Sequence, residues 1–111
     1  MSLTAKQCIP CQGGIPPLPR HEAEKYLVET PGWTLAEDSS IIQRTFKFKN
    51  FASALDFVNR IGRLAEGEGH HPDITFGWGY CTVVLQTHKI KGLHENDFIM
   101  AAKINALYAA P

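Results

Sequence analysis

The chain has 111 residues, of which 44% are hydrophobic, enough for one core and one domain. Eleven Lys and Arg residues balance eleven Asp and Glu residues, so no net charge would attract nucleic acid or an anionic membrane surface. No apolar run approaches the roughly 20 residues of a membrane span, and the first residues do not resemble a signal peptide. An odd count of three cysteines then indicates free thiols rather than a disulfide framework. We therefore expect a cytoplasmic protein with no nucleic-acid or membrane partner.

The first twenty residues contain four of the seven prolines and show neither helical nor strand periodicity. We predict an irregular N-terminal arm over residues 1–20, followed by a single domain over residues 21–111. Cys8 and Cys11 in the arm form a C-x-x-C pair, a spacing that serves to bind zinc or to cycle between dithiol and disulfide. A closed zinc site would need two more ligands, for which only His21 and Cys81 are candidates. The simplest interpretation is a flexible arm without chemistry of its own.

Seven predicted helices and strands follow the arm. Their patterns predict helix, strand, strand, helix, strand, strand and helix over residues 21–29, 33–36, 41–48, 51–65, 74–78, 80–88 and 95–109. Two hairpins with helices between them predict an α+β fold, in which three helices pack on one face of a four-stranded antiparallel sheet.

The central helix has the clearest pattern. Asn50 is suited to cap its first turn, and Gly67 and Gly69 are expected to end it. Apolar residues at helical spacing predict its core-facing side: Phe51, Ala54, Leu55, Val58, Ile61 and Ala65.

Four of the five histidines fall between residues 66 and 97. His70 and His71 precede one strand of the second hairpin and His88 ends the other, so antiparallel pairing would bring the three imidazoles to one cleft. Imidazole gives or takes a proton near neutral pH, because its ordinary pKa is about 6.5, and two held at fixed separation serve as acid and base. Dehydration and tautomerisation are chemistries that suit such a site.

Other interpretations stay open at this point. Each histidine taken singly is typical of a partly exposed turn, and three histidines are able to hold zinc with an open fourth position. The usual i, i+4 and H-x-H ligand spacings are missing, which weighs against a metal. Four aromatic residues could form a stacking platform for a flat heterocycle, although each is individually typical of a core: Trp33, Phe46, Phe48 and Trp78. The glycines follow no phosphate-binding pattern.

A set of spaced residues runs through the histidine region: Glu66, His70, His71, Pro72, Trp78, His88 and Asp97. Their order and spacing resemble the signature of the pterin-4a-carbinolamine dehydratases. Further matches extend the resemblance over most of the chain, at Gly32-Trp33, residues 44–48, Asn50-Phe51, Ala54, Phe57, Thr87-His88 and Gly92-Leu93. The arm lies outside the signature.

The resemblance implies the same fold, a homodimer or homotetramer, and catalysis without a metal or organic cofactor. The family dehydrates 4a-hydroxytetrahydropterin to quinonoid dihydropterin, in tetrahydrobiopterin recycling or a related pterin pathway. Carried over by position, the catalytic residues are His70, His71 and His88, supported by Glu66 and Asp97. Candidates for contact with the pterin are Gly69, Pro72, Gln86, Thr87 and Trp33.

One departure from the family is His94, which stands where a threonine or serine often caps the last helix, so we expect a weaker cap. The resemblance also implies an alternative function, because a mammalian relative acts as an oligomerisation cofactor for another protein alongside catalysis. The sequence does not specify which pterin is the substrate, which histidine is the acid, or how many subunits assemble.

Overall fold

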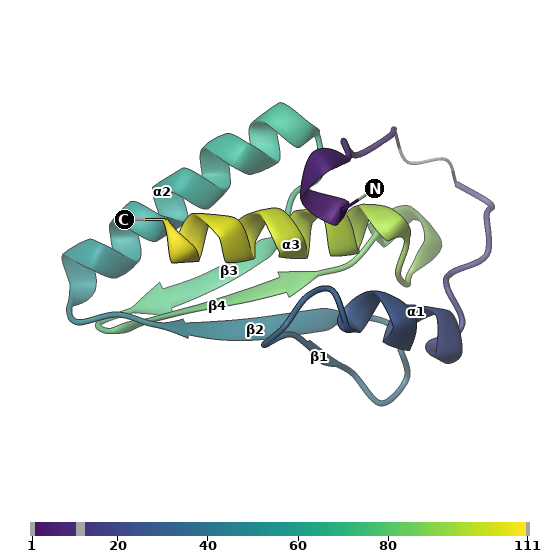
Figure 1. Cartoon of the computed structure of the whole chain (residues 1–111), viewed down its shortest axis with the longest axis horizontal. Coiled ribbons are helices and arrows are strands. Elements are labelled where there is room, and N and C mark those ends of the chain that lie inside the picture. Colours follow the sequence, from purple (N-terminus) through teal and green to yellow (C-terminus); the bar gives the residue numbers. More distant parts are fainter. Residues whose placement is uncertain (1, 11–12, 111) are drawn as a thin grey trace.

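The computed structural model describes residues 2–10 and 13–110. In chain order the elements are the 3-10 helix η1 (Leu3–Ala5), α1 (Arg20–Leu27), β1 (Thr34–Leu35), β2 (Ile42–Lys47), α2 (Phe51–Glu68), β3 (Asp73–Gly77), β4 (Tyr80–Leu85), the 3-10 helix η2 (His88–Ile90) and α3 (Glu95–Ala109). The strands form one antiparallel sheet in the order β1-β2-β4-β3 (Figure 1). The predicted α+β fold is confirmed.

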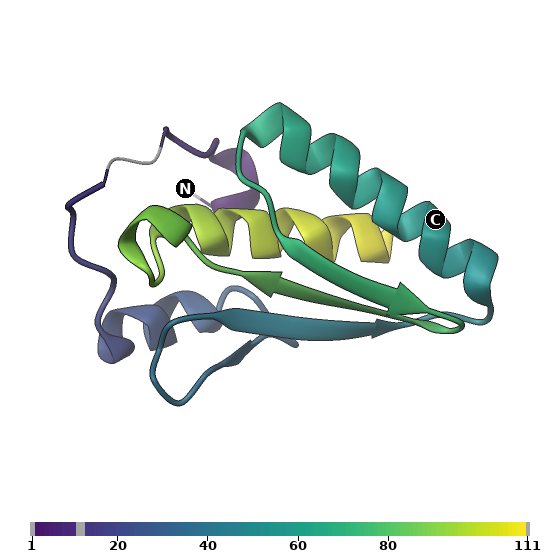
Figure 2. The same cartoon turned by 180° about the vertical axis from the view of Figure 1, so that it is seen from behind.

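The helices cover one face of the sheet, and the core lies between them. Figure 1 and its reverse view in Figure 2 show α2 and α3 on the same side of the strands, and α1 packs against β1 and α3. Side chains alternate along a strand, so Ile42 and Phe46 of β2 are buried while Gln43 and Thr45 between them are exposed. The face with Ile42 and Phe46 is therefore the one that meets the helices.

The central helix begins where it was predicted and continues past Gly67. The Asn50 side chain accepts a hydrogen bond from the Ser53 amide at 2.8 Å, which confirms the predicted cap. Gly69 ends the helix in a left-handed conformation with φ of 67°. Its buried residues are Ala54, Phe57, Ile61 and Ala65, whereas Phe51 and Leu55 are exposed. The buried stripe is therefore rotated from the predicted one, because the sheet meets the helix on the side of Phe57.

The last strand is shorter than predicted. Strand β4 ends at Leu85, and His88 begins the 3-10 turn η2 instead of ending the strand. Thr87 pairs only with Gly92, through an isolated bridge that closes this turn. Lys91 takes the left-handed conformation there, with φ of 51°. The polar turn, rather than the strand pattern, thus sets the position of His88.

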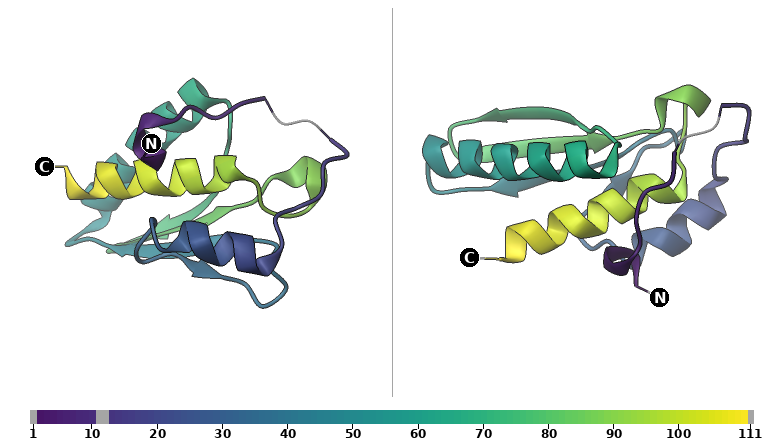
Figure 3. Two further views of the ribbon diagram at one scale, coloured as in Figure 1. Left: turned by 45° about the vertical axis from the view of Figure 1, so that its right-hand side comes forward. Right: turned by 90° about the horizontal axis from the view of Figure 1, so that it is seen from above.

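Helix α3 is surrounded on most sides at its first turns, where residues 96–102 are all buried. Helices α1, α2 and η1 all contact it (Figure 3), and Phe46 of the sheet packs on its Tyr108. The arm was predicted to be irregular and flexible, yet Leu3 is buried in the core and η1 packs on α3. In the described part of the chain, no helix has the length and apolar character needed to cross a membrane.

Candidate active site

His70 and Asp97 form a buried pair between α2 and α3. His70 follows Gly69 directly and is 8% exposed, while Asp97, in the first turn of α3, is completely buried. The Nε2 atom of His70 lies 2.7 Å from Oδ1 of Asp97. The other oxygen, Oδ2, accepts hydrogen bonds from the Thr87 hydroxyl at 2.8 Å and from the His94 amide at 3.0 Å. One carboxylate therefore joins the ends of α2 and β4 to the start of α3.

This arrangement fixes how the His70 ring is held. A carboxylate only accepts hydrogen bonds, so the proton shared with Asp97 is carried on Nε2 of His70. The second ring nitrogen, Nδ1, is then the atom left for proton exchange. Asp97 thus sets the orientation of the imidazole as well as its position, the role that a carboxylate partner often has beside a working histidine.

His94 caps α3 in place of the expected threonine or serine. Its Nδ1 accepts a hydrogen bond from the Asn96 amide at 3.1 Å, and its own amide donates to Asp97. Together these bonds form a capping box. The ring nitrogen provides the acceptor that a hydroxyl would have provided, and the weaker cap stays a prediction.

His71 and His88 are the exposed histidines of the group. The His71 Nε2 atom contacts the Glu66 carboxylate, which lies on the last turn of α2. The His88 Nε2 atom lies 3.7 Å from Oδ2 of Asp73, the first residue of β3. The side chains of the two histidines are 61% and 63% exposed. Each imidazole thus has a carboxylate neighbour and access to solvent.

Asp73 was not among the predicted site residues. Nothing in its local sequence marks it, apart from its position two residues after His71 at the start of a strand. The antiparallel register places Asp73 opposite Val84, near the end of β4, and so on the side where the chain turns towards His88. The pairing of β3 with β4 is what brings this carboxylate to the histidine.

The predicted convergence of chain segments is therefore present. The turn before β3 carries His70 and His71, and the turn after β4 carries Thr87 and His88. Asp97 contacts the first turn through His70 and the second through Thr87, while Asp73 links the same two turns through His88. Gly69 and Pro72 flank the two adjacent histidines.

Two predicted contact residues lie elsewhere. Trp33 is buried in the core, where its Nε1 donates to Asn105 Oδ1 at 2.8 Å and its ring packs on Phe46. Gln86 donates to the Ser40 carbonyl at 3.2 Å, in the connection between β1 and β2. Neither side chain makes a hydrogen bond to the histidine group, and their contact with a pterin stays a prediction.

The four aromatic residues considered as a stacking platform do not form one. Phe46 and Phe48 belong to a core cluster with Phe57 and Tyr108. Trp78 is 72% exposed in the turn between β3 and β4, at the opposite end of the hairpin from His70. The strands of this hairpin are about five residues long, so at about 3.3 Å per residue Trp78 lies roughly 17 Å from the end that carries the histidines.

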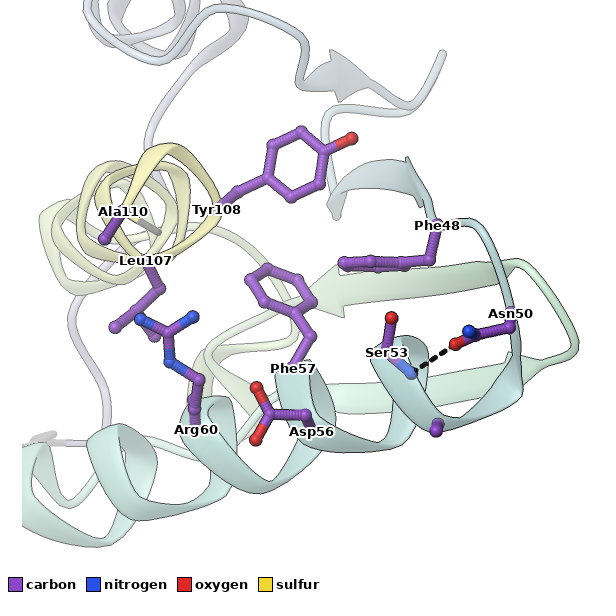
Figure 4. Close-up of a pocket in the computed structure, with 10 residues that line it drawn as sticks. Phe48, Asn50, Ser53, Asp56, Phe57, Arg60, Leu107, Tyr108 and Ala110 are labelled. Atoms are coloured by element: carbon purple, nitrogen blue, oxygen red, sulfur yellow. Dashed lines mark hydrogen bonds between the residues drawn. The ribbon is translucent and has the colours of Figure 1, made fainter.

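Two hollows on the surface have the size of a small-molecule site. The first, of about 630 Å³, lies between the start of α2 and the end of α3, and Figure 4 shows Phe48, Phe57 and Tyr108 around it. No histidine lines it. The second, of about 610 Å³, runs along α2 and β3 and is lined by Val58, Asn59, Gly62, Arg63, Glu66 and Ile74. No histidine lines the second hollow either, but one of its lining residues, Glu66, contacts His71.

The two described cysteines carry free thiols of low reactivity. Burial, together with the Glu68 carboxylate, raises the pKa of Cys8 to about 12, and burial raises that of Cys81 to about 11. Cys11, the other half of the C-x-x-C pair, lies outside the described residues. Within residues 2–10 and 13–110, no three His, Cys, Asp or Glu side chains are grouped so as to hold a metal ion.

Comparison with known proteins identifies the fold and family. A family model described as pterin 4 alpha carbinolamine dehydratase matches residues 16–107. A protein of Methylococcus capsulatus is 65% identical over 97% of this chain and 95% of its own length, and one of Cupriavidus pinatubonensis is 63% identical over 96% and 92%. Both carry the name pterin-4-alpha-carbinolamine dehydratase as a provisional assignment.

Two solved structures are also similar. A crystal structure of a transcriptional coactivator/pterin dehydratase from Brucella melitensis has a TM-score of 0.77 and 34% identity, covering 82% of this chain and 97% of that one. A pterin dehydratase-like protein, identified as a RuBisCO assembly factor in the alpha-carboxysome, has a TM-score of 0.62 and 25% identity, covering 72% and 93%. The chain thus has the fold of a pterin dehydratase. It belongs to the pterin-4α-carbinolamine dehydratase family and is a dehydratase enzyme of that family.

Proposed function

We propose that this enzyme removes water from 4a-hydroxytetrahydropterin to give quinonoid dihydropterin, with histidines as general acid and base. The observation that supports it most directly is the Asp97 carboxylate, which holds His70 and, through Thr87, the turn that carries His88. The two turns that carry these imidazoles are thereby joined, which would favour paired acid–base catalysis.

The elimination needs one proton given and one taken. An imidazolium, His88 or His70, protonates the C4a hydroxyl, and the C4a–O bond breaks to release water. A neutral imidazole takes the proton from N5, whose electrons form the N5=C4a double bond of the quinonoid product. His70 exchanges its proton at Nδ1, since Asp97 occupies Nε2. Acid–base catalysis of this kind accelerates reactions by about 10² to 10⁴-fold, or roughly 3 to 5 kcal/mol of barrier.

The hollow along α2 and β3 is the proposed place for the pterin ring. Its volume of about 610 Å³ suits a bicyclic heterocycle, and Glu66 and Arg63 provide polar groups on its wall. His71, beside Glu66, would hold the ring rather than exchange its protons. No organic cofactor or metal is needed for the steps written above.

The test is the rate of dehydration of freshly generated 4a-hydroxytetrahydropterin, followed by absorbance. We expect the wild type to accelerate the reaction, and folded His70→Ala and His88→Ala variants to lose most of that acceleration. His21→Ala is the matched control, because His21 is an exposed histidine on α1 and should leave the rate unchanged. A folded wild type that matches the uncatalysed rate would overturn the proposal.

A second candidate function is that of an oligomerisation cofactor for a partner protein. It is favoured by the two solved relatives, one described as a transcriptional coactivator and one as an assembly factor. Exposed apolar side chains at Phe51, Leu55 and Trp78 are available for such a contact. Recovery of no stoichiometric partner with the tagged protein would count against this role.

We also propose that the chain forms a homodimer or homotetramer and works in the cytoplasm. The first is what the resemblance to the family implies, and the second agrees with the free thiols of Cys8 and Cys81. Light scattering after size-exclusion chromatography measures the first, where a monomeric mass would refute it. Cell fractionation measures the second, where recovery outside the cytoplasmic fraction would refute it.

A further inference from the structure

Residues 8 and 9 of the N-terminal arm contact Glu68 and Asn96, which lie close in the chain to His70 and Asp97. The arm's helix η1 packs on α3, and the chain after it crosses towards the end of α2 (Figures 1 and 3). Leu3 is 3% exposed and belongs to the core, so the arm is anchored by burial as well as by hydrogen bonds. This segment lies outside residues 16–107, the part of the chain that the family model matches.

Asn96, the residue directly before Asp97, connects the arm to the first turn of α3. Its side chain is buried and pairs with Ile9 at both backbone groups: Nδ2 donates to the Ile9 carbonyl at 2.7 Å, and Oδ1 accepts from the Ile9 amide at 3.1 Å. The Asn96 carbonyl also accepts from the Cys8 thiol at 3.7 Å. The first turn of α3, which carries Asp97, is therefore tied to the arm at three points.

Glu68 makes the corresponding connection on the histidine side. It is the last residue of α2, two positions before His70, and its side chain is 14% exposed. One carboxylate oxygen accepts from the Cys8 amide at 2.8 Å, and the other contacts the Lys103 ammonium of α3 at 2.8 Å. The Cys8 amide thus bonds to the end of α2, and the Ile9 amide bonds to the start of α3.

We propose that Asn96 and Glu68 are positioning residues, which use residues 8 and 9 of the arm to set the separation of His70 from Asp97. The His70–Asp97 hydrogen bond spans the same two helix ends that the arm joins. If the arm moves, those ends are free to shift, and a shift of about 1 Å in a catalytic group is able to cost about 100-fold in rate. The inference rests on the proposed role of His70 in proton transfer.

A merely structural arm would affect stability alone, and α3 offers a matched control for that case. Asn105 lies about two and a half turns beyond Asn96 and also ties α3 to other segments, by accepting from Trp33 and Arg44 and donating to the Pro31 carbonyl. Asn96→Ala and Asn105→Ala each remove one side-chain amide and its hydrogen bonds. Only the first touches the arm.

Three measurements on the full-length protein test the proposal, all well below the unfolding temperature of each variant. We expect Asn96→Ala to lower kcat about 10 to 100-fold with KM little changed, as a shift of about 1 Å would do. We expect it also to weaken the downfield proton NMR signal of the His70 Nε2–H group and to speed alkylation of Cys8. Asn105→Ala should lose stability yet keep kcat, the signal and the slow alkylation.

The outcomes separate this inference from the proposed function. A folded Asn96→Ala protein with wild-type kcat and an unchanged imidazole signal would overturn the positioning role, even if the enzyme dehydrates the pterin through His70. A wild type without activity, or a His70→Ala variant with full activity, would instead overturn the proposed function. If Asn96→Ala does not fold, the milder Asn96→Ser change, which keeps a short polar side chain, decides by the same readouts.

Discussion

Replacing Asp97 with asparagine changes one atom at the centre of the site and almost nothing in its shape. The carboxylate accepts from three donors, His70 Nε2, the Thr87 hydroxyl and the His94 amide. An amide has a single acceptor oxygen, which would face Thr87 and His94, so its NH₂ group would face His70. The imidazole must then accept rather than donate, which moves its proton to Nδ1 and reverses the tautomer.

The magnitude follows from these bonds. A charge-assisted hydrogen bond contributes about 1.5 to 3 kcal/mol and the neutral one that replaces it about 1 kcal/mol, so Asp97→Asn should lower the free energy of unfolding by about 0.5 to 2 kcal/mol. In a domain of this size that is a fall of about 2 to 9 °C in Tm. The dehydration rate should fall by about 10² to 10⁴-fold, because Nδ1 of His70 then already carries a proton in the neutral imidazole and is not free to accept one.

Thermal unfolding followed by circular dichroism, together with the dehydration assay, measures both effects. Asp73→Asn makes the same chemical change at an exposed carboxylate and should leave Tm near that of the wild type. A folded Asp97→Asn enzyme with wild-type kcat would show that the tautomer of His70 has no part in the reaction. A variant with wild-type Tm would show that the buried network does not stabilise the fold.

Three further predictions concern the arm and the helix that leads to the histidines. The hydrogen bond from Lys6 lowers the pKa of Glu95 below its ordinary 4.5, so this pair stabilises the fold above that pH and the stabilisation is lost as the pH falls through the folded pKa. Lys6→Met should therefore be less stable than the wild type in denaturant at pH 7, with the difference shrinking at pH 3; a constant difference would contradict this. Cys8, with its pKa raised to about 12, should be alkylated far more slowly in the folded than in the urea-unfolded protein, as measured by peptide mass spectrometry; equal rates would mean that the arm is not docked. Asn50→Ala should cost about 1 kcal/mol of unfolding free energy through loss of the α2 cap, and an unchanged urea midpoint would argue against that cap.

The order of elements was predictable because each depends on short-range signals. Helical spacing from Ala54 to Ala65, the cap at Asn50 and the left-handed stop at Gly69 are all local, and the structure has them. Errors occurred where two local signals competed, as at the end of β4. There the β-branched residues favoured a longer strand, while the turn closed by the Thr87–Gly92 bridge ended it.

The histidine group was predictable in part. Antiparallel pairing alone brings the turn before β3 next to the turn after β4, so the sequence is enough to predict His70, His71 and His88 at one end of the hairpin. The pairing of Asp73 with His88 was missed, and so was the use of the His94 ring nitrogen as the cap acceptor. Both depend on where a side chain points, and a single sequence has no signal for that.

Periodicity, turn residues and the spacing of the histidines are properties of the chain read in order, and they are enough to predict the fold class, the element order and the family. The burial of His70 against Asp97, the core position of Trp33 and the docking of the arm on Asn96 and Glu68 are visible only in the folded protein. The physical reason is distance along the chain. His70 meets a partner 27 residues away and Cys8 one 60 residues away, and such contacts are chosen by packing of the whole core rather than by local preference.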